Sequence, residues 1–205
     1  KGQSHILQYN YQDRLIINMG YSYHYNSIGG AIINNTIASN SYSIRFNFES
    51  AGNIMYALSK ATNIRKNNDG EYAILGIPYA QYVKGEFDFS KNIRIDHRNS
   101  FAFHIGMGIA VPYGNAKTIP FEKQYFSGGA NSVRGWTVRD LGPGSFVRDE
   151  NTNLLDQSGD IKLDASIEYR SKLFWKFQGA IFVDAGNIWT IRDYDNQPGG
   201  VFKFD

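Results

Sequence analysis

The chain has 205 residues, with 21 Lys and Arg against 19 Asp and Glu, so its formal net charge is +2. This balance argues against a nucleic-acid-binding protein, and a composition of 42% hydrophobic and 20% charged residues argues against a disordered chain. The absence of cysteine excludes disulfides, thiolate metal sites and a cysteine nucleophile.

The main pattern along the chain is an alternation of apolar and polar side chains with a period of two, which is typical of β-strands. In chain order the alternating runs are 14–25, 42–49, 83–89, 101–111 and 161–169, followed by the mixed stretch 173–185. Most runs are about 9 to 12 residues long, whereas strands of soluble domains are typically ~5–6 residues and tilted transmembrane strands ~9–11. The lengths favour a transmembrane barrel with its apolar face outward, and a soluble β-sandwich or lipocalin-like barrel stays open as the alternative.

One segment between the second and third runs has helical spacing. Ile54, Ala57, Leu58 and Ala61 would share one face of a helix. The cluster at 67–70 (Asn-Asn-Asp-Gly) would end it. We therefore predict a short helix near residues 52–62.

The connections between the runs differ in length. Short connections are expected at 11–13, 97–100 and 171–172, and long ones at 29–39, 50–77, 114–159 and 190–200. Outer-membrane barrels have short turns on one side and longer loops on the other, so this difference also favours a barrel.

The third long connection, 114–159, has the composition of a folded segment. It contains many aromatic residues, and Gly128, Gly129 and Gly135 would permit positive φ and close backbone packing. An arginine buried in such a loop, Arg134, would need an anionic partner. The loop can therefore fold compactly on itself.

Two carboxylates on the polar faces of the later strands are candidate partners for that arginine. Glu168 is on the polar face of 161–169, and Asp184 has the same parity in the next run, although Phe182 interrupts that polar face. If the loop enters the barrel, Arg134 could bind both acids through its planar guanidinium. We call these three residues the lumenal lock. The alternative is an exposed loop arginine with two unrelated acids in the lumen.

The loop sequence FEKQYFSGGANSVRGW, followed by LGPG, resembles the signature loop of the BamA/TamA superfamily of outer-membrane assembly factors, the bacterial surface antigen proteins. The family tetrapeptide is usually VRGF or VRGY, and here it is Val133, Arg134, Gly135 and Trp136. The segments ASIEY (165–169) and FVDAGNIW (182–189) resemble the strand motifs that carry the partner acids in that family. The resemblance thus implies the same pairing of Arg134 with Glu168 and Asp184.

The resemblance also implies an architecture. The family barrel has sixteen strands, so residues 1–205 would form one part of an all-β, antiparallel transmembrane barrel with about seven to eight strands and an inward-folded loop. A further strand would start at Val201. The chain lacks an initiating Met and is expected to be a piece of a longer protein, with its POTRA domains and terminal strands outside this chain.

The function implied by the resemblance is non-enzymatic assembly, insertion or translocation of proteins at the outer membrane of a Gram-negative bacterium. The expected partners are outer-membrane lipids, unfolded outer-membrane or surface proteins, and accessory lipoproteins or periplasmic proteins, but no nucleic acid. The four histidines are scattered, and no catalytic residue, metal site or cofactor is predicted. A passive outer-membrane channel or transporter is the alternative, and a soluble ligand carrier is a third class.

Overall fold

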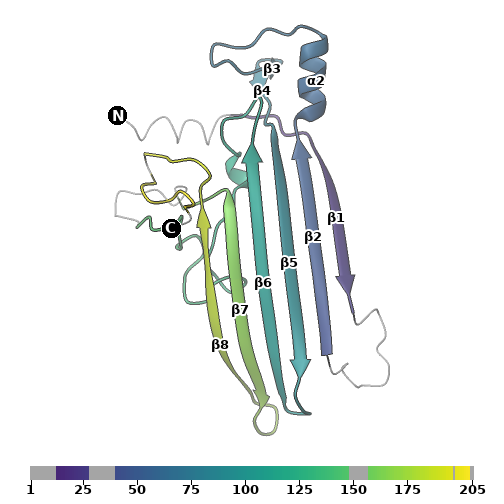
Figure 1. Cartoon of the computed structure of the whole chain (residues 1–205), viewed down its shortest axis with the longest axis vertical. Coiled ribbons are helices and arrows are strands. Elements are labelled where there is room, and N and C mark those ends of the chain that lie inside the picture. Colours follow the sequence, from purple (N-terminus) through teal and green to yellow (C-terminus); the bar gives the residue numbers. More distant parts are fainter. Residues whose placement is uncertain (1–12, 28–39, 148–156, 196, 204–205) are drawn as a thin grey trace.

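The computed structural model describes residues 13–27, 40–147, 157–195 and 197–203. Six strands form one curved antiparallel sheet in the order β1-β2-β5-β6-β7-β8 (Figure 1). Their bounds are β1 (Asn18–Asn26), β2 (Asn40–Ala51), β5 (Tyr82–Arg94), β6 (Asn99–Pro112), β7 (Ile161–Lys172) and β8 (Gln178–Trp189). Two short strands, β3 (Ala73–Ile74) and β4 (Ile77–Pro78), make a separate hairpin. About seven to eight barrel strands were predicted, and the described residues form six strands of the barrel sheet besides the short β3-β4 hairpin.

The apolar face of the sheet is exposed and the opposite face is buried, which is the reverse of a sheet in a soluble protein. On β6, the apolar side chains of Ile105, Met107 and Ile109 are 43–48% exposed, whereas Gly106 and Gly108 on the opposite face are buried. The same alternation holds on β7, where every second side chain from residue 163 to residue 167 is exposed. The apolar face is thus the outer one, as in a barrel that meets lipid.

The sheet is an open section of barrel wall, with β1 and β8 at its edges. The predicted strand at Val201 is absent from the described residues, because Val201 makes only an isolated bridge with Thr190. The all-β antiparallel fold and the alternating runs are confirmed, including β8, whose sequence pattern is mixed.

The connections gather at two ends. The connections 52–81 and 113–160, the second described except for 148–156, leave the same end of the sheet, and the turns 95–98 and 173–177 lie at the other end (Figure 1). The predicted long connection at 29–39 lies outside the described residues. The predicted turn at 11–13 lies mostly outside the described residues.

The predicted helix is confirmed as α2 (Asn53–Ala61), which stands beyond the end of the sheet (Figure 1). Its predicted apolar face is exposed, with Ile54 53% and Leu58 52% accessible, and its buried residue is Ser59. The helix also ends well before residues 67–70. Within the described part of the chain, no helix has the length and apolar character needed to cross a bilayer.

Candidate functional site

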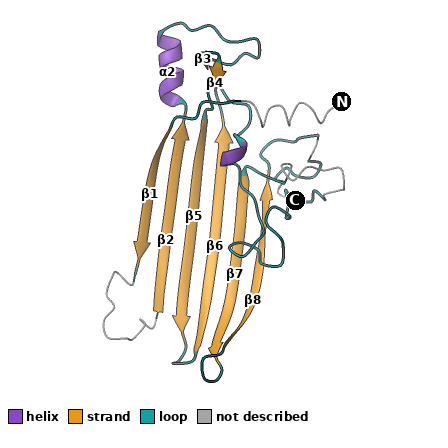
Figure 2. Cartoon of the chain, turned by 180° about the vertical axis from the view of Figure 1, so that it is seen from behind, coloured by secondary structure: helices purple, strands orange, loops and turns teal. Residues whose placement is uncertain are grey.

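The connection between β6 and β7 folds back over the inner face of the sheet. Seen from behind, it passes in front of β6, β7 and β8 (Figure 2). Its backbone is closed by hydrogen bonds: Tyr125 N–H donates to Gly159 O (2.8 Å), Gly159 N–H donates to Tyr125 O (2.9 Å), and Arg139 N–H donates to Ser127 O (3.0 Å). The polar backbone of an inward loop is satisfied in this way without a regular helix or strand.

Arg134 lies between the two predicted carboxylates. Its Nε and Nη2 donate to the two oxygens of Asp184, each at 2.7 Å, and its backbone N–H donates to Asp184 Oδ2 at 3.0 Å. Its Nη1 donates to Glu168 Oε2. The Asp184 side chain is only 3% exposed and that of Glu168 13% exposed. One arginine thus joins the loop to two adjacent strands, β7 and β8.

An aromatic ring completes the surroundings of Arg134. The guanidinium carbon lies 3.6 Å from the ring centroid of Phe182, which is on the same face of β8 as Asp184. This stacking explains why an apolar residue interrupts the polar face, because the ring attracts the cation electrostatically. Hydrogen bonds to Asp184 and then to Glu168 raise the pKa of the Arg134 guanidinium above its usual value.

The predicted loop residues differ in what they do. Gly128 and Gly129 have φ of 98° and 90°, and a Cβ at either position would collide with Thr137 or Val138. Gly135 has neither a positive φ nor any heavy atom within 4 Å of a built Cβ, so the predicted conformational need for glycine there is wrong.

Val133 and Trp136 flank Arg134 with different exposure. Val133 is buried against β8, where a Cβ built on Gly186 would lie 3.0 Å from Val133 Cγ2. The Trp136 side chain is 48% exposed, and its carbonyl accepts a hydrogen bond from Gly129 N–H (2.8 Å). The valine therefore packs the loop on the sheet, while the tryptophan contributes mainly through its backbone.

A second contact fixes the start of the loop. The Tyr125 ring lies over Gly108 of β6, its hydroxyl donates to Gly85 O (3.2 Å), and Lys84 Nζ lies 4.3 Å from the ring centroid. Burial, followed by the nearby charge of Glu86, raises the pKa of the Tyr125 hydroxyl, which keeps it protonated as a donor. We call this the tyrosine contact.

The 3₁₀ turn η1 (Phe121–Lys123) adds a charged contact with the far side of the sheet. Lys123 Nζ lies 2.8 Å from Glu49 Oε1 on β2, and the same carboxylate accepts hydrogen bonds from Tyr82 and Asn18. Lys84 Nζ donates to Lys123 O (3.1 Å). The loop is therefore joined to β2, β5, β6, β7 and β8.

The LGPG segment holds the last part of the loop. Gly144 N–H donates to Ile188 O (2.7 Å), and Asn187 Nδ2 donates to Gly144 O (2.9 Å). Gly142 has a φ of 85° and lies against Asn187 and Ile188. This segment thus contacts the C-terminal end of β8.

Most of this chain matches a known protein family. Residues 34–203 match the family model described as the Omp85 superfamily domain. The chain belongs to the Omp85 superfamily. The predicted resemblance to the BamA/TamA superfamily and the location in the Gram-negative outer membrane are thereby confirmed.

This Omp85 chain spans less than half the length of the two relatives that follow. Over 99 residues the chain is 35% identical to the outer membrane protein assembly factor BamA of Neisseria meningitidis serogroup B. The aligned region covers 44% of this chain and 12% of that protein. The crystal structure of BamA from Haemophilus ducreyi lacking POTRA domains 1–3 is 17% identical, with a TM-score of 0.44, over 86% of this chain and 42% of that chain.

Several residues that contact this Omp85 loop or belong to it were not recognised from the sequence as site residues. Tyr125, Lys123 and Gly186 belong to motifs that the sequence shows, but their partners lie on strands far away in the chain. The available signal was the pair of small inward residues on β6, Gly106 and Gly108, because a wall without side chains leaves room for a loop. Across the described ranges, no group of three or more His, Asp or Glu is arranged to hold a metal ion.

Proposed function

We propose that this chain is a barrel portion of a non-enzymatic factor that assembles, inserts or translocates proteins at the outer membrane. The observation that supports it is the Arg134 contact, in which one loop residue pairs with acids on two adjacent strands. The printed name of the Neisseria relative, an outer membrane protein assembly factor, supports the same role.

In this proposal the lumenal lock keeps the loop inside the barrel and stiffens the wall formed by β7 and β8. A half-buried guanidinium that loses its acids, or acids that lose the guanidinium, would leave uncompensated charge. The stiff wall would confine strand opening to another part of the full barrel, where an unpaired edge could pair with an unfolded client strand. Outer-membrane lipids, client proteins, and accessory lipoproteins or periplasmic proteins are the proposed partners.

A passive channel or transporter is less well supported. Such a barrel requires an open lumen, whereas here the loop occupies the inner face in front of three strands (Figure 2).

The test uses the full-length protein reconstituted in lipid vesicles, with Arg134→Ala and Arg134→Lys variants. We expect Arg134→Ala to slow the folding of an added outer-membrane protein at least tenfold and to make the loop sensitive to protease. Arg134→Lys should restore only part of the activity, because a single ammonium cannot replace the bidentate contact with Asp184.

The control is Arg65→Ala, which removes one exposed positive charge from the segment that follows α2. Its client folding rate should equal that of the wild type. Unchanged client folding in Arg134→Ala, with the loop still released, would contradict the proposed function while leaving the structural role of Arg134 intact.

A further inference from the structure

The two acids of the lumenal lock differ in the number of cations that contact them. The carboxylate of Glu168 is shared, because its Oε2 accepts a hydrogen bond from Arg134 Nη1 and its Oε1 accepts one from Arg170 Nε at 2.5 Å. Asp184 is not shared, since Arg134 is the cation that contacts it among the described residues. If Arg134 leaves, Glu168 therefore keeps a cationic partner and Asp184 does not.

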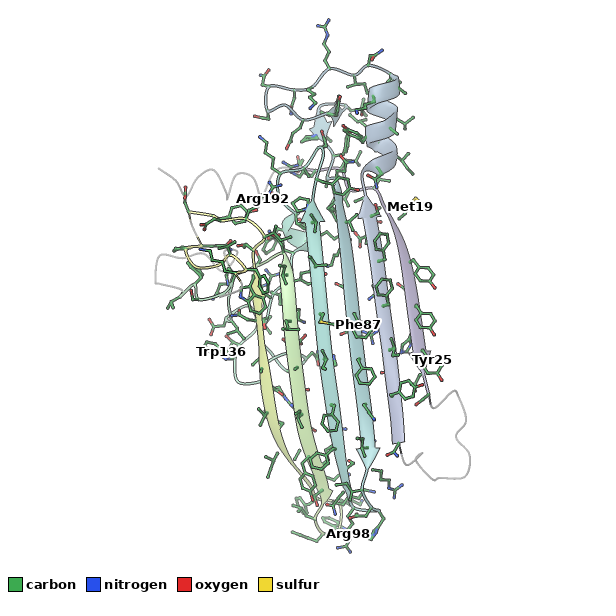
Figure 3. The ribbon with its side chains drawn as sticks, in the orientation of Figure 1. Met19, Tyr25, Phe87, Arg98, Trp136 and Arg192 are labelled. Atoms are coloured by element: carbon green, nitrogen blue, oxygen red, sulfur yellow. The ribbon has the colours of Figure 1, made fainter. Side chains whose placement is uncertain are left out.

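Arg170 lies on the inner face of β7, one step nearer the turn end than Glu168. The strand register places it opposite Ser100 on β6 and Ala180 on β8, which are both small. The tip of the loop, marked by Trp136, lies farther from the turn end (Figure 3). The Arg170 side chain is 54% exposed, so more than half of it stays accessible while the loop is docked.

The surroundings of Arg170 leave its side chain room to turn. A cavity of about 360 Å³ lies beside it, lined by Glu168, by Arg170 itself and by polar side chains such as Ser90 and His104. Its Nε donates to Glu168, whereas its Nη1 and Nη2 donate to no described residue. Arg170 can therefore offer a second hydrogen bond to the same carboxylate once Arg134 has left.

A second cation reduces what the Arg134–Glu168 contact contributes to docking of the loop. That contribution is the difference between Glu168 in the docked state and Glu168 in the released state. With Arg170 present, the carboxylate is paired in the released state as well. In the docked state two positive guanidiniums share one acid, and like charges repel. Both effects favour release.

We propose that Arg170 is the release partner of the lumenal lock: it keeps Glu168 paired when Arg134 withdraws, and so lowers the free energy needed to free the loop from β7 and β8. The inference rests on the proposed function only in treating the freed loop as a state that the protein visits. An arginine that merely oriented Glu168 for Arg134 would have the opposite effect, because its removal would weaken docking.

The first test is amide hydrogen exchange in the reconstituted full-length protein. The N–H of Arg134 donates to Asp184 Oδ2 (3.0 Å) in the docked loop, so its protection reports on release. Arg170→Ala should raise this protection about two- to fivefold, the range that an exposed ion pair supports. The control Arg94→Ala removes an arginine from the same row of the inner face, where its Nε donates to Asp96 O (2.9 Å), and should leave the protection unchanged.

The second test asks whether the effect acts through the shared carboxylate. In a Glu168→Gln background, Arg170→Ala should leave the protection unchanged, and Arg170→Lys in the wild-type background should exchange like the wild type because it keeps the charge. Lower or unchanged protection in Arg170→Ala, an equal rise in Arg94→Ala, or an effect that persists in Glu168→Gln would overturn the proposal. No client protein is present in these measurements, so a failure of the proposed function in the client-folding assay is seen separately.

Discussion

The ring of Tyr125 occupies the space that a side chain on Gly108 would need, since a Cβ built on Gly108 would lie 2.6 Å from Tyr125 Cζ. The two residues belong to the loop and to the middle of β6, and the ring also meets Lys84. The loop is therefore held by packing against a wall position that has no side chain, as well as by the charges around Arg134.

The Gly108→Ala substitution is expected to lower the free energy of unfolding by about 1–3 kcal/mol, because an added methyl group overpacks a filled site. The loop should also become sensitive to protease near residue 125. Denaturant unfolding of the reconstituted full-length protein measures the first effect. Gly85→Ala is the control, since a Cβ there meets no heavy atom within 4 Å, and equal stability of both variants would refute the tyrosine contact.

The two acids of the lumenal lock should contribute unequally. Asp184 accepts three hydrogen bonds from Arg134, whereas Glu168 accepts one from Arg134 and one from Arg170. We expect Asp184→Asn to cost on the order of 2 kcal/mol and Glu168→Gln about half of that. Heat-modifiable gel mobility of the full-length variants gives the order, and a greater loss for Glu168→Gln would show that Asp184 is not the main partner.

The glycines of the loop motif should respond differently to alanine. Gly128→Ala places a Cβ against Thr137 O in a left-handed backbone and is expected to cost about 1 kcal/mol or more. Gly135→Ala meets open space and should leave the unfolding midpoint unchanged. Thermal unfolding of both variants in detergent measures this difference. An unfolding midpoint of Gly135→Ala as low as that of Gly128→Ala would contradict the prediction.

The turn at 95–98 should loosen in acid. Hydrogen bonds from the Asn99 side chain and from the backbone N–H of Arg98 hold the pKa of Asp96 below its usual value. A lowered pKa in the folded state means that the ionised carboxylate stabilises the turn above pH ~4, and that this contribution is lost as the pH falls through the lowered value. Amide hydrogen exchange at Arg98 and Asn99 should show protection that decreases with acid, and Asp96→Ala should remove that pH dependence.

Much of the sheet could be predicted because alternation with a period of two is a local property. The pattern around Ile105 and Phe46 indicated both the strands and their outward apolar face. It was weakest for β8, because Phe182 faces inward to stack on Arg134. The helix was also predictable, yet its exposed Ile54 and buried Ser59 were not, since its surroundings come from residues such as Tyr79, whose hydroxyl donates to Ser59 Oγ (3.3 Å).

The sequence by itself determined the membrane-type strands, the position of the loop and the candidate partners of Arg134, because strand parity and a long motif are contained in neighbouring residues. Only the tertiary structure decided that Val133 packs on Gly186, that Tyr125 covers Gly108, and that Gly135 is under no steric restriction. These facts depend on how residues from distant strands fill one space, and no local pattern carries that information.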